Sequence, residues 1–416
     1  MTDGLSEKTS IIDHICGLSA SEGAEAGLPD ELRYWESVRD AHDEGKKLIF
    51  INGPVPTEII YAMDCVPLYL DLLPSRVSED AELTSRLINL AEARSKLSLC
   101  SLQMLNSGIL ISGELGLTPD AYITLPISCD SARTACVEMS RFIDAPAFHF
   151  DIPLRNSESS LRYIKMQLEK MISFLEEITG VALDWEKVKA RMELYNRSAG
   201  LLDECSGLRS ARPCPLSAHT TVLNELMNAF GPTKNMAELL LREAELCRKR
   251  SAEGLSPCLG GEKHRVLLIH NLNRQAAGLS SFMEKDYGAV TVADGFCFAR
   301  RELFSGFGDR DACLNIMCRR MQSGAMAHGA GVPGEELLKS IDDIIGTYTP
   351  DVFIFLGNRG CRHAWAMTKM VSDALQNRYG LPMLMLDVDN TDFRYKSEKE
   401  LCSLIAEYMD TVVNKI

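Results

Sequence analysis

Cysteine is the residue type in this chain whose number most suggests reactive or metal-binding chemistry, with 14 cysteines among 416 residues. They are scattered and do not form the compact framework of a small secreted domain, so we expect no disulfides. No C-x-x-C pair occurs, which argues against zinc ribbons and thioredoxin-type chemistry. Most of the thiols, Cys313 and Cys318 on a predicted helix among them, are expected to be small buried apolar side chains. A few could instead bind metal in a reducing compartment.

Three thiols stand where a ligand site is expected. Cys129 directly follows the apolar segment AYITLPI, Cys361 follows VFIFL after a short glycine-containing turn, and Cys100 begins a predicted helix. In open α/β sheets, ligands bind at the carboxyl ends of the strands, so these thiols could converge in a cleft between two α/β units. The glycines beside Cys361 would let the backbone approach a bulky group. Position alone leaves a metal site and separate buried thiols both open.

Eight short apolar segments predict the strands that would position these thiols. They fall into two groups of four: 47–52, 66–72, 121–127 and 146–152, then 265–269, 289–293, 352–356 and 383–386. Apolar residues at helical spacing fill the gaps, with Thr57 as the cap of a helix that ends at Asp64 and further helices at 81–95, 101–113, 130–142, 335–346, 363–378 and 397–413. Strands that alternate with helices predict parallel sheets with helices on both faces.

Strand signals disappear between the two groups, where the spacing predicts helices from about 157 and around 184–202, 218–230 and 235–249. The sequence therefore predicts an α/β protein with two doubly wound, parallel-sheet (flavodoxin-like) domains joined by a helical segment. The predicted parts are an N-terminal segment of polar helices, the first α/β domain, the helical linking region and the second α/β domain, at 1–45, 46–156, 157–255 and 256–416.

Composition narrows the classes of function. The net charge is −14, which argues against nucleic-acid binding because such proteins need a basic surface. The sequence contains no run of about 18 apolar residues, so we expect no transmembrane helix. The first ten residues, MTDGLSEKTS, do not resemble a secretory signal, so we expect a cytoplasmic protein. An acidic chain would need a local group of Lys or Arg residues to bind an anionic ligand.

Residues 329–334 match the G-x-G-x-x-G pattern of dinucleotide-binding loops. That loop must follow a strand and open a helix, whereas the preceding residues MQSGAMAH do not read as a strand and a proline sits inside the turn. We therefore interpret this stretch as a loop before a helix. No Walker A sequence is present either, so any use of ATP is expected to belong to another protein.

Short blocks around the three cysteines occur in a characteristic order along most of residues 40–400. They are Pro56–Ala62 with Val66-Pro67, Leu99-Cys100-Ser101, Pro119–Ala121 with Ser128-Cys129-Asp130-Ser131, Phe150–Pro153, Ala293–Cys297, Gly360-Cys361-Arg362 and Leu386–Asp389. Together they resemble the 2-hydroxyacyl-CoA dehydratase family, which also includes benzoyl-CoA reductase subunits and double-cubane cluster proteins. The residues after Cys100 and Cys361, Leu-Gln-Met and Arg-His-Ala-Trp, depart from the family pattern, which leaves the substrate open.

The resemblance implies a hydro-lyase that removes water from a 2-hydroxyacyl-CoA. The family reaction uses a one-electron reduction to a ketyl radical, because the hydrogen beta to the carbonyl is too weakly acidic for ordinary base catalysis. It implies a [4Fe–4S] cluster held by Cys100, Cys129 and Cys361, with one iron open to an oxygen of the substrate. It also implies two kinds of partner: a related second dehydratase subunit or a second copy of the chain, and an ATP-hydrolysing iron–sulfur activator that supplies the electron.

Three residues in or near the matched blocks are candidates for catalysis. Glu58 and Asp71 could act as bases, and Ser101 could donate a hydrogen bond to a cluster sulfur or to substrate. Each also has an ordinary structural interpretation: Glu58 as a first-turn helix carboxylate, Asp71 as a solvated residue at the end of the second strand, and Ser101 as a helix N-terminal serine. His363 could titrate near the cluster or be structural.

Other interpretations stay open. A reductase or electron-transfer component with a double-cubane cluster would need more ligands, for which Cys136, Cys214, Cys258 and Cys297 are available. A non-catalytic electron-delivery or interaction partner would keep the cluster without turning over an acyl-CoA. A metal-free α/β scaffold would tolerate serine or alanine in place of each of the three cysteines.

Overall fold

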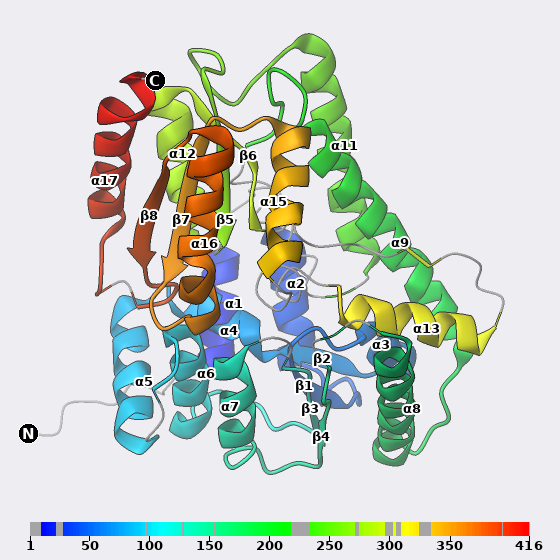
Figure 1. Ribbon diagram of the computed structural model, residues 1–416. Coiled ribbons are helices and arrows are strands. Elements are labelled where there is room, and N and C mark those ends of the chain that lie inside the picture. Colours follow the sequence, from blue (N-terminus) through cyan, green and yellow to red (C-terminus); the bar gives the residue numbers. More distant parts are fainter. Residues whose placement is uncertain are drawn as a thin grey trace, which may run out of the picture.

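Two parallel sheets of four strands each organise the chain in the computed structural model (Figure 1). The described residues are 10–21, 28–95, 98–126, 129–153, 155, 157–217, 231, 233–270, 274–295, 303–304, 309–323, 334–392 and 394–415. The strand orders are β2-β1-β3-β4 and β6-β5-β7-β8, so the two sheets have the same topology. This is the order of the first four strands of a flavodoxin-like fold, and it confirms the predicted α/β class with two doubly wound domains.

All eight predicted strands are present. The first sheet has β1 Leu48–Asn52, β2 Val66–Tyr69, β3 Ala121–Thr124 and β4 Ala147–His149, and the second has β5 His264–His270, β6 Ala289–Ala293, β7 Val352–Asn358 and β8 Met383–Val388. Every pairing is parallel. The central strands β1 and β7 are buried along their whole length, as their unbroken apolar sequences predict.

Helices cover both faces of each sheet. The first domain contains α1 Ile11–Ser21, α2 Leu28–Arg39, α3 Thr57–Ala62, α4 Leu73–Val77, α5 Ala81–Arg94, α6 Ser101–Ser112 and α7 Asp130–Met139. The linking region contains α8 Glu158–Thr179, α9 Trp185–Leu208 and α11 Lys234–Glu253. The second domain follows with α12 Arg274–Tyr287, α13 Arg310–Met321, α15 Gly334–Tyr348, α16 Arg362–Tyr379 and α17 Glu398–Thr411, before the 3-10 turn Val413–Lys415.

Successive side chains of β1 point to opposite faces of the first sheet, so they contribute to two separate buried clusters. Leu48 and Phe50 belong to one buried cluster with residues of α1, α2, α5 and α6, while Ile49 and Ile51 belong to the opposite one with α3 and α8. The second sheet is packed in the same way, with α15 and α16 on one face and α12 and α17 on the other. Of the helices that the structure describes, none combines the length and apolar composition needed to cross a lipid bilayer.

Helix α13 joins the two halves of the chain. It lies between β6 and β7 in sequence, yet it packs beside α8 on the first domain (Figure 1). Its cysteines Cys313 and Cys318 are buried there among apolar residues, which confirms the core role predicted for them.

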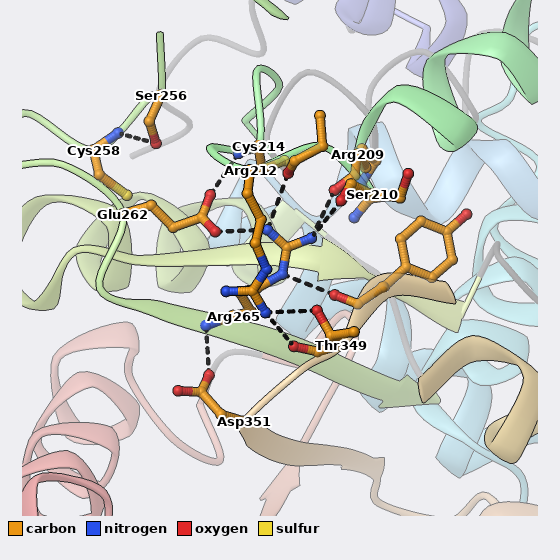
Figure 2. A network of polar contacts seen from close by, with 12 residues as sticks. Arg209, Ser210, Arg212, Cys214, Ser256, Cys258, Glu262, Arg265, Thr349 and Asp351 are labelled. Carbon is orange, nitrogen blue, oxygen red and sulfur yellow. Dashed lines mark hydrogen bonds and ion pairs between the residues drawn. The ribbon is translucent and has the colours of Figure 1, made fainter. Parts of the chain in front are cut away.

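A buried arginine fastens the linking region to the second domain. Arg265 on β5 is 2% exposed, and its guanidinium donates to the carbonyl oxygens of Arg209, Ala211 and Tyr348 at 2.8–3.1 Å (Figure 2). It also pairs with Glu262 at 2.6 Å. These bonds satisfy backbone carbonyls just after the end of α9 that would otherwise be buried without donors.

Some predicted boundaries are wrong. The second strand ends at Tyr69, and Leu70–Leu72 forms a 3-10 turn that contains Asp71. Thr57 does not cap a helix, because Pro56 holds the N-cap position and Thr57 is the first helical residue. The first helix, α1, is not polar, since Ile11, Ile12 and Ile15 are buried in the first domain's core. The predicted helix at 218–230, most of the 329–334 glycine pattern and Cys297 lie outside the described residues.

Candidate functional site

The three cysteines singled out by position occupy the same structural place, the N-cap of a helix. Cys100 precedes α6, Cys129 precedes α7 and Cys361 precedes α16, each with an extended backbone. An N-cap side chain points toward the free amides of the first helical turn, where the positive end of the helix dipole favours an anion. A thiolate is stabilised at such a position.

First-turn amides act on all three thiols. The sulfur of Cys129 accepts a hydrogen bond from the amide of Ala132 at 3.3 Å. The amides of Gln103 and Ala364 act in the same sense on Cys100 and Cys361, where they partly offset the rise in pKa that burial causes. Their geometry falls short of a complete capping hydrogen bond.

The two domains approach each other at these helix ends. Figure 1 shows β7 and β8 directed toward the first domain, where the lower end of α16 meets the ends of α6 and α7. Gly360, which precedes Cys361, has a φ of +84°, and a Cβ placed on it would lie 3.2 Å from the Cα of Cys100. Glycine is needed here both for the left-handed backbone and for the close approach. The loop that carries Cys361 therefore packs directly on Cys100.

Burial and mutual repulsion oppose ionisation of the three thiols. Burial, together with the neighbouring Cys129 and Cys361, raises the pKa of Cys100 to about 12 in spite of the lowering effect of the Gln103 amide. Burial also raises the pKa of Cys129 and of Cys361, and Cys361 adds to the effect on Cys129. A bound cationic group would remove this conflict, because metal ligation deprotonates thiols outright.

The chemistry of the three thiols suits an iron–sulfur cluster, whose irons are held by cysteine thiolates. Among the described residues, no three His, Cys, Asp or Glu side chains are grouped closely enough to hold a single metal ion. Three gathered thiols are a soft donor set of the kind that such clusters use.

Asp71 lies beside this group in a network of hydrogen bonds. Its carboxylate accepts from Asn52 Nδ2 at 2.7 Å, from the Gly53 amide at 2.9 Å and from Gln103 Nε2 at 3.2 Å. Burial nevertheless raises the pKa of Asp71 above its usual range. Gln103 thus connects Asp71 to the first turn of the helix that Cys100 caps. Asp71 is half-buried and bonded, not the solvated loop residue of the ordinary interpretation.

Ser101 bridges the two domains. Its hydroxyl donates a short hydrogen bond to Asp389, which lies 288 residues away at the end of β8. Asp389 also accepts from the amides of Thr391 and Asp392 at 3.1 and 2.9 Å, and its burial raises its pKa. Close by, His363 Nε2 lies 3.6 Å from the carboxylate of Asp130, which begins α7. The Ser101–Asp389 hydrogen bond thus joins the two domains next to the thiols.

Glu58 is placed differently. It is fully buried in α3 and pairs with Arg320 of α13 at 2.6 Å. The guanidinium of Arg320 lies over the rings of Tyr195 and Phe304, with ring-centroid distances of 3.7 and 5.0 Å. The second carboxylate oxygen of Glu58, Oε2, has no hydrogen-bond partner among the described residues. Within the same residues, no contact joins Glu58 to the three thiols.

The further cysteines considered for a larger cluster lie in two separate places where the structure describes them. Cys136 donates to Asn52 Oδ1 at 2.6 Å, in the Asp71 network. Cys214 and Cys258 are buried in the apolar core between the second sheet and α15 and α16. Position after a strand pointed to Cys129 and Cys361, and position at a helix start pointed to Cys100. The contacts of Asn52, Gln103 and Asp389 instead join distant segments. Asn52, the last residue of β1, carried only the weak signal of a polar strand end.

A prediction follows from the contact at Gly360. Alanine there would be strained at φ +84° and would crowd Cys100, at a cost of about 1–3 kcal/mol for the backbone alone. We expect Gly360→Ala to lower both the thermal unfolding midpoint and the iron content after anaerobic purification. The matched control is Gly380→Ala, where φ is +67° and no atom lies within 4 Å of the added Cβ. Equal effects of the two substitutions would contradict the proposed close approach.

Comparison with known proteins now adds to this geometry. Residues 54–403 match the family described as 2-hydroxyglutaryl-CoA dehydratase, D-component, and the chain belongs to this family. It is 22% identical over 340 residues to the (R)-phenyllactyl-CoA dehydratase alpha subunit of Clostridium sporogenes, covering 76% of this chain and 77% of that protein. It is 25% identical over 242 residues to the (R)-2-hydroxyisocaproyl-CoA dehydratase alpha subunit of Clostridioides difficile, covering 55% and 58% of the two chains.

Proposed function

We propose that this protein is the iron–sulfur subunit of a 2-hydroxyacyl-CoA dehydratase and that Cys100, Cys129 and Cys361 hold its [4Fe–4S] cluster. The observation that carries the proposal is the gathering of three N-cap thiols from both domains at one place. Family membership and the names of the two relatives support a dehydratase component. The proposed reaction removes water from a 2-hydroxyacyl-CoA through a ketyl radical of the substrate.

When bound, such a cluster supplies single-electron reduction and, with three protein ligands, one iron open to a substrate oxygen. The chain's own residues have the remaining tasks. The helix N-termini of α6, α7 and α16 stabilise the thiolates. The Ser101–Asp389 hydrogen bond holds the two domains together beside them.

Asp71 is our first candidate for proton transfer. Its raised pKa brings it closer to the working pH than an ordinary aspartate, which suits a group that must both accept and release a proton. Glu58 is the second candidate, because its carboxylate is already paired with Arg320. We place Ser101 as a positioning residue through its bond to Asp389.

Two kinds of partner are part of the proposal. Both relatives are named as alpha subunits, so we infer a related second subunit, or a second copy of this chain, in the active enzyme. An ATP-hydrolysing iron–sulfur activator would deliver the electron. We place the assembly in the cytoplasm.

The test is an anaerobic assay with a panel of 2-hydroxyacyl-CoA esters, the related subunit and the activator from the same source. We expect enoyl-CoA formation that requires ATP and activator. A cluster that is reduced by the activator but forms no enoyl-CoA from any ester would favour the electron-delivery alternative. About eight irons per chain would favour the double-cubane reductase instead.

Replacement of Asp71 by asparagine keeps the shape of the side chain but removes its ability to carry a proton. We expect turnover to fall by about 10²–10⁴-fold with unchanged iron content, as for loss of a general acid–base group. Asp40→Asn, at an exposed carboxylate paired with Arg39, is the matched control and should be silent. Undiminished turnover in Asp71→Asn would remove Asp71 from the mechanism.

A further inference from the structure

His270 occupies the position in the second sheet where ligands usually bind. It is the last residue of β5, and it pairs in register with Leu356 of β7. The order β6-β5-β7-β8 reverses direction between β5 and β7, and the carboxyl ends of strands at such a reversal form a binding crevice. The neighbouring β7 leads directly to Cys361, so His270 and Cys361 belong to the same edge of the sheet.

The backbone and ring of His270 are both constrained. Its φ is +79°, a left-handed value that side chains other than glycine rarely adopt outside functional sites. The imidazole stacks on Phe355 with centroids 5.8 Å apart and an angle of 17° between the rings. Phe355 in turn meets the edge of Trp365 at 5.4 Å, and Trp365 lies in the first turn of α16, which Cys361 caps. The ring is therefore fixed relative to the Cys361 loop.

One ring nitrogen of His270 is left without a partner. Nε2 is buried, and among the residues that the structure describes no group forms a hydrogen bond with it. A buried polar atom in this state is costly unless another molecule completes it. Burial also lowers the pKa of His270 to about 4, so the imidazole is neutral at physiological pH. A neutral ring suits an uncharged oxygen better than a phosphate.

We propose that His270 Nε2 forms a hydrogen bond with the carbonyl or 2-hydroxyl oxygen of the acyl group of the thioester substrate. This role rests on the proposed function, because it takes a 2-hydroxyacyl-CoA as the ligand. It makes His270 a substrate-binding residue contributed by the second domain. None of the sequence blocks that carry the family resemblance contains it.

The experiment measures the dissociation constant of a 2-hydroxyacyl-CoA without activator, so that no turnover is needed. His270→Phe keeps an aromatic ring for the Phe355 stack but removes both nitrogens. His270→Asn tolerates the left-handed backbone and keeps a hydrogen-bonding group. We expect about a tenfold weaker affinity for His270→Phe and a smaller change for His270→Asn, with iron content unchanged in both. The control is His264→Phe at the opposite end of β5, where His264 pairs with Asp351.

The ester without the 2-hydroxyl separates the two oxygens. If the hydroxyl is the partner, His270→Phe and wild type should bind that ester equally well, whereas a carbonyl partner keeps the tenfold difference. Equal affinity of wild type and His270→Phe for both esters would overturn the proposal. It would also be overturned if wild-type protein with its full iron content bound neither ester. If His270→Phe fails to fold, two other results together would overturn the proposal. His270→Asn would bind both esters with the same affinity as wild type, and the ¹⁵N signal of labelled His270 in wild type would not move when ester is added. Iron content and turnover of wild type test the proposed function separately.

Discussion

The Cys361→Ser chain is expected to fold normally, to lose its iron and to lose more than about 100-fold in turnover. Serine is one of the best N-cap residues, so the helix that Cys361 caps should keep or gain stability. The hydroxyl, however, is a harder and weaker ligand than a thiolate for an iron–sulfur cluster, which uses soft sulfur donors. The same argument applies to Cys100→Ser and Cys129→Ser, because both residues are also N-caps. Substitution thus separates the ligand role from the structural one.

Iron per chain, circular dichroism and activator-coupled turnover check this prediction together. Cys402→Ser within α17 is the matched control, since it makes the same chemical change at a half-buried thiol that is not an N-cap. It should retain iron and activity. Full iron and undiminished turnover in all three N-cap variants would instead favour the metal-free scaffold.

The second large effect is expected at Arg265. Arg265→Met would leave Glu262 buried with its charge partner removed and would leave the carbonyls of Arg209, Ala211 and Tyr348 without their donors (Figure 2). Loss of one partner from a buried ion pair typically destabilises a protein by about 3–5 kcal/mol. Because Arg265 connects the linking region to the second domain, we expect this loss to appear in the unfolding of that domain.

Urea-induced unfolding followed by the fluorescence of Trp365, in a chain with Trp35 and Trp185 replaced by phenylalanine, measures the effect, because Trp365 lies in the second domain. Arg378→Met serves as the control. Arg378 pairs with Asp342 on the surface of the same domain, where an ion pair contributes about 1 kcal/mol or less. Similar midpoints for the two variants would show that the Arg265 network contributes little to stability.

The eight strands could be predicted from local sequence, whereas the strand ends and the position of α13 could not. Unbroken apolar segments such as 48–51 and 352–356 fill both faces of a parallel sheet, so the eight strands could be located without the structure. The strand ends were less certain: 66–72 reads as one apolar segment, but the chain turns after Tyr69 because the next residues form a 3-10 turn. Helix α13 could not be assigned to the first domain, because its position depends on packing against α8.

The candidate site was predictable only in part, for the same reason. Position after a strand identified Cys129 and Cys361, because strand ends can be recognised from apolar periodicity. The bond from Ser101 to Asp389 and the pairing of Glu58 with Arg320 join residues 288 and 262 positions apart. No local pattern carries such pairs. The catalytic roles proposed for Ser101 and Glu58 stay predictions.

The measurement that tests the central claim most directly is iron and acid-labile sulfide per chain, after strictly anaerobic purification. The account predicts about four of each, lost on replacement of any of the three N-cap cysteines. A protein with no iron, even after reconstitution with iron and sulfide, would contradict the assignment of a cluster to Cys100, Cys129 and Cys361.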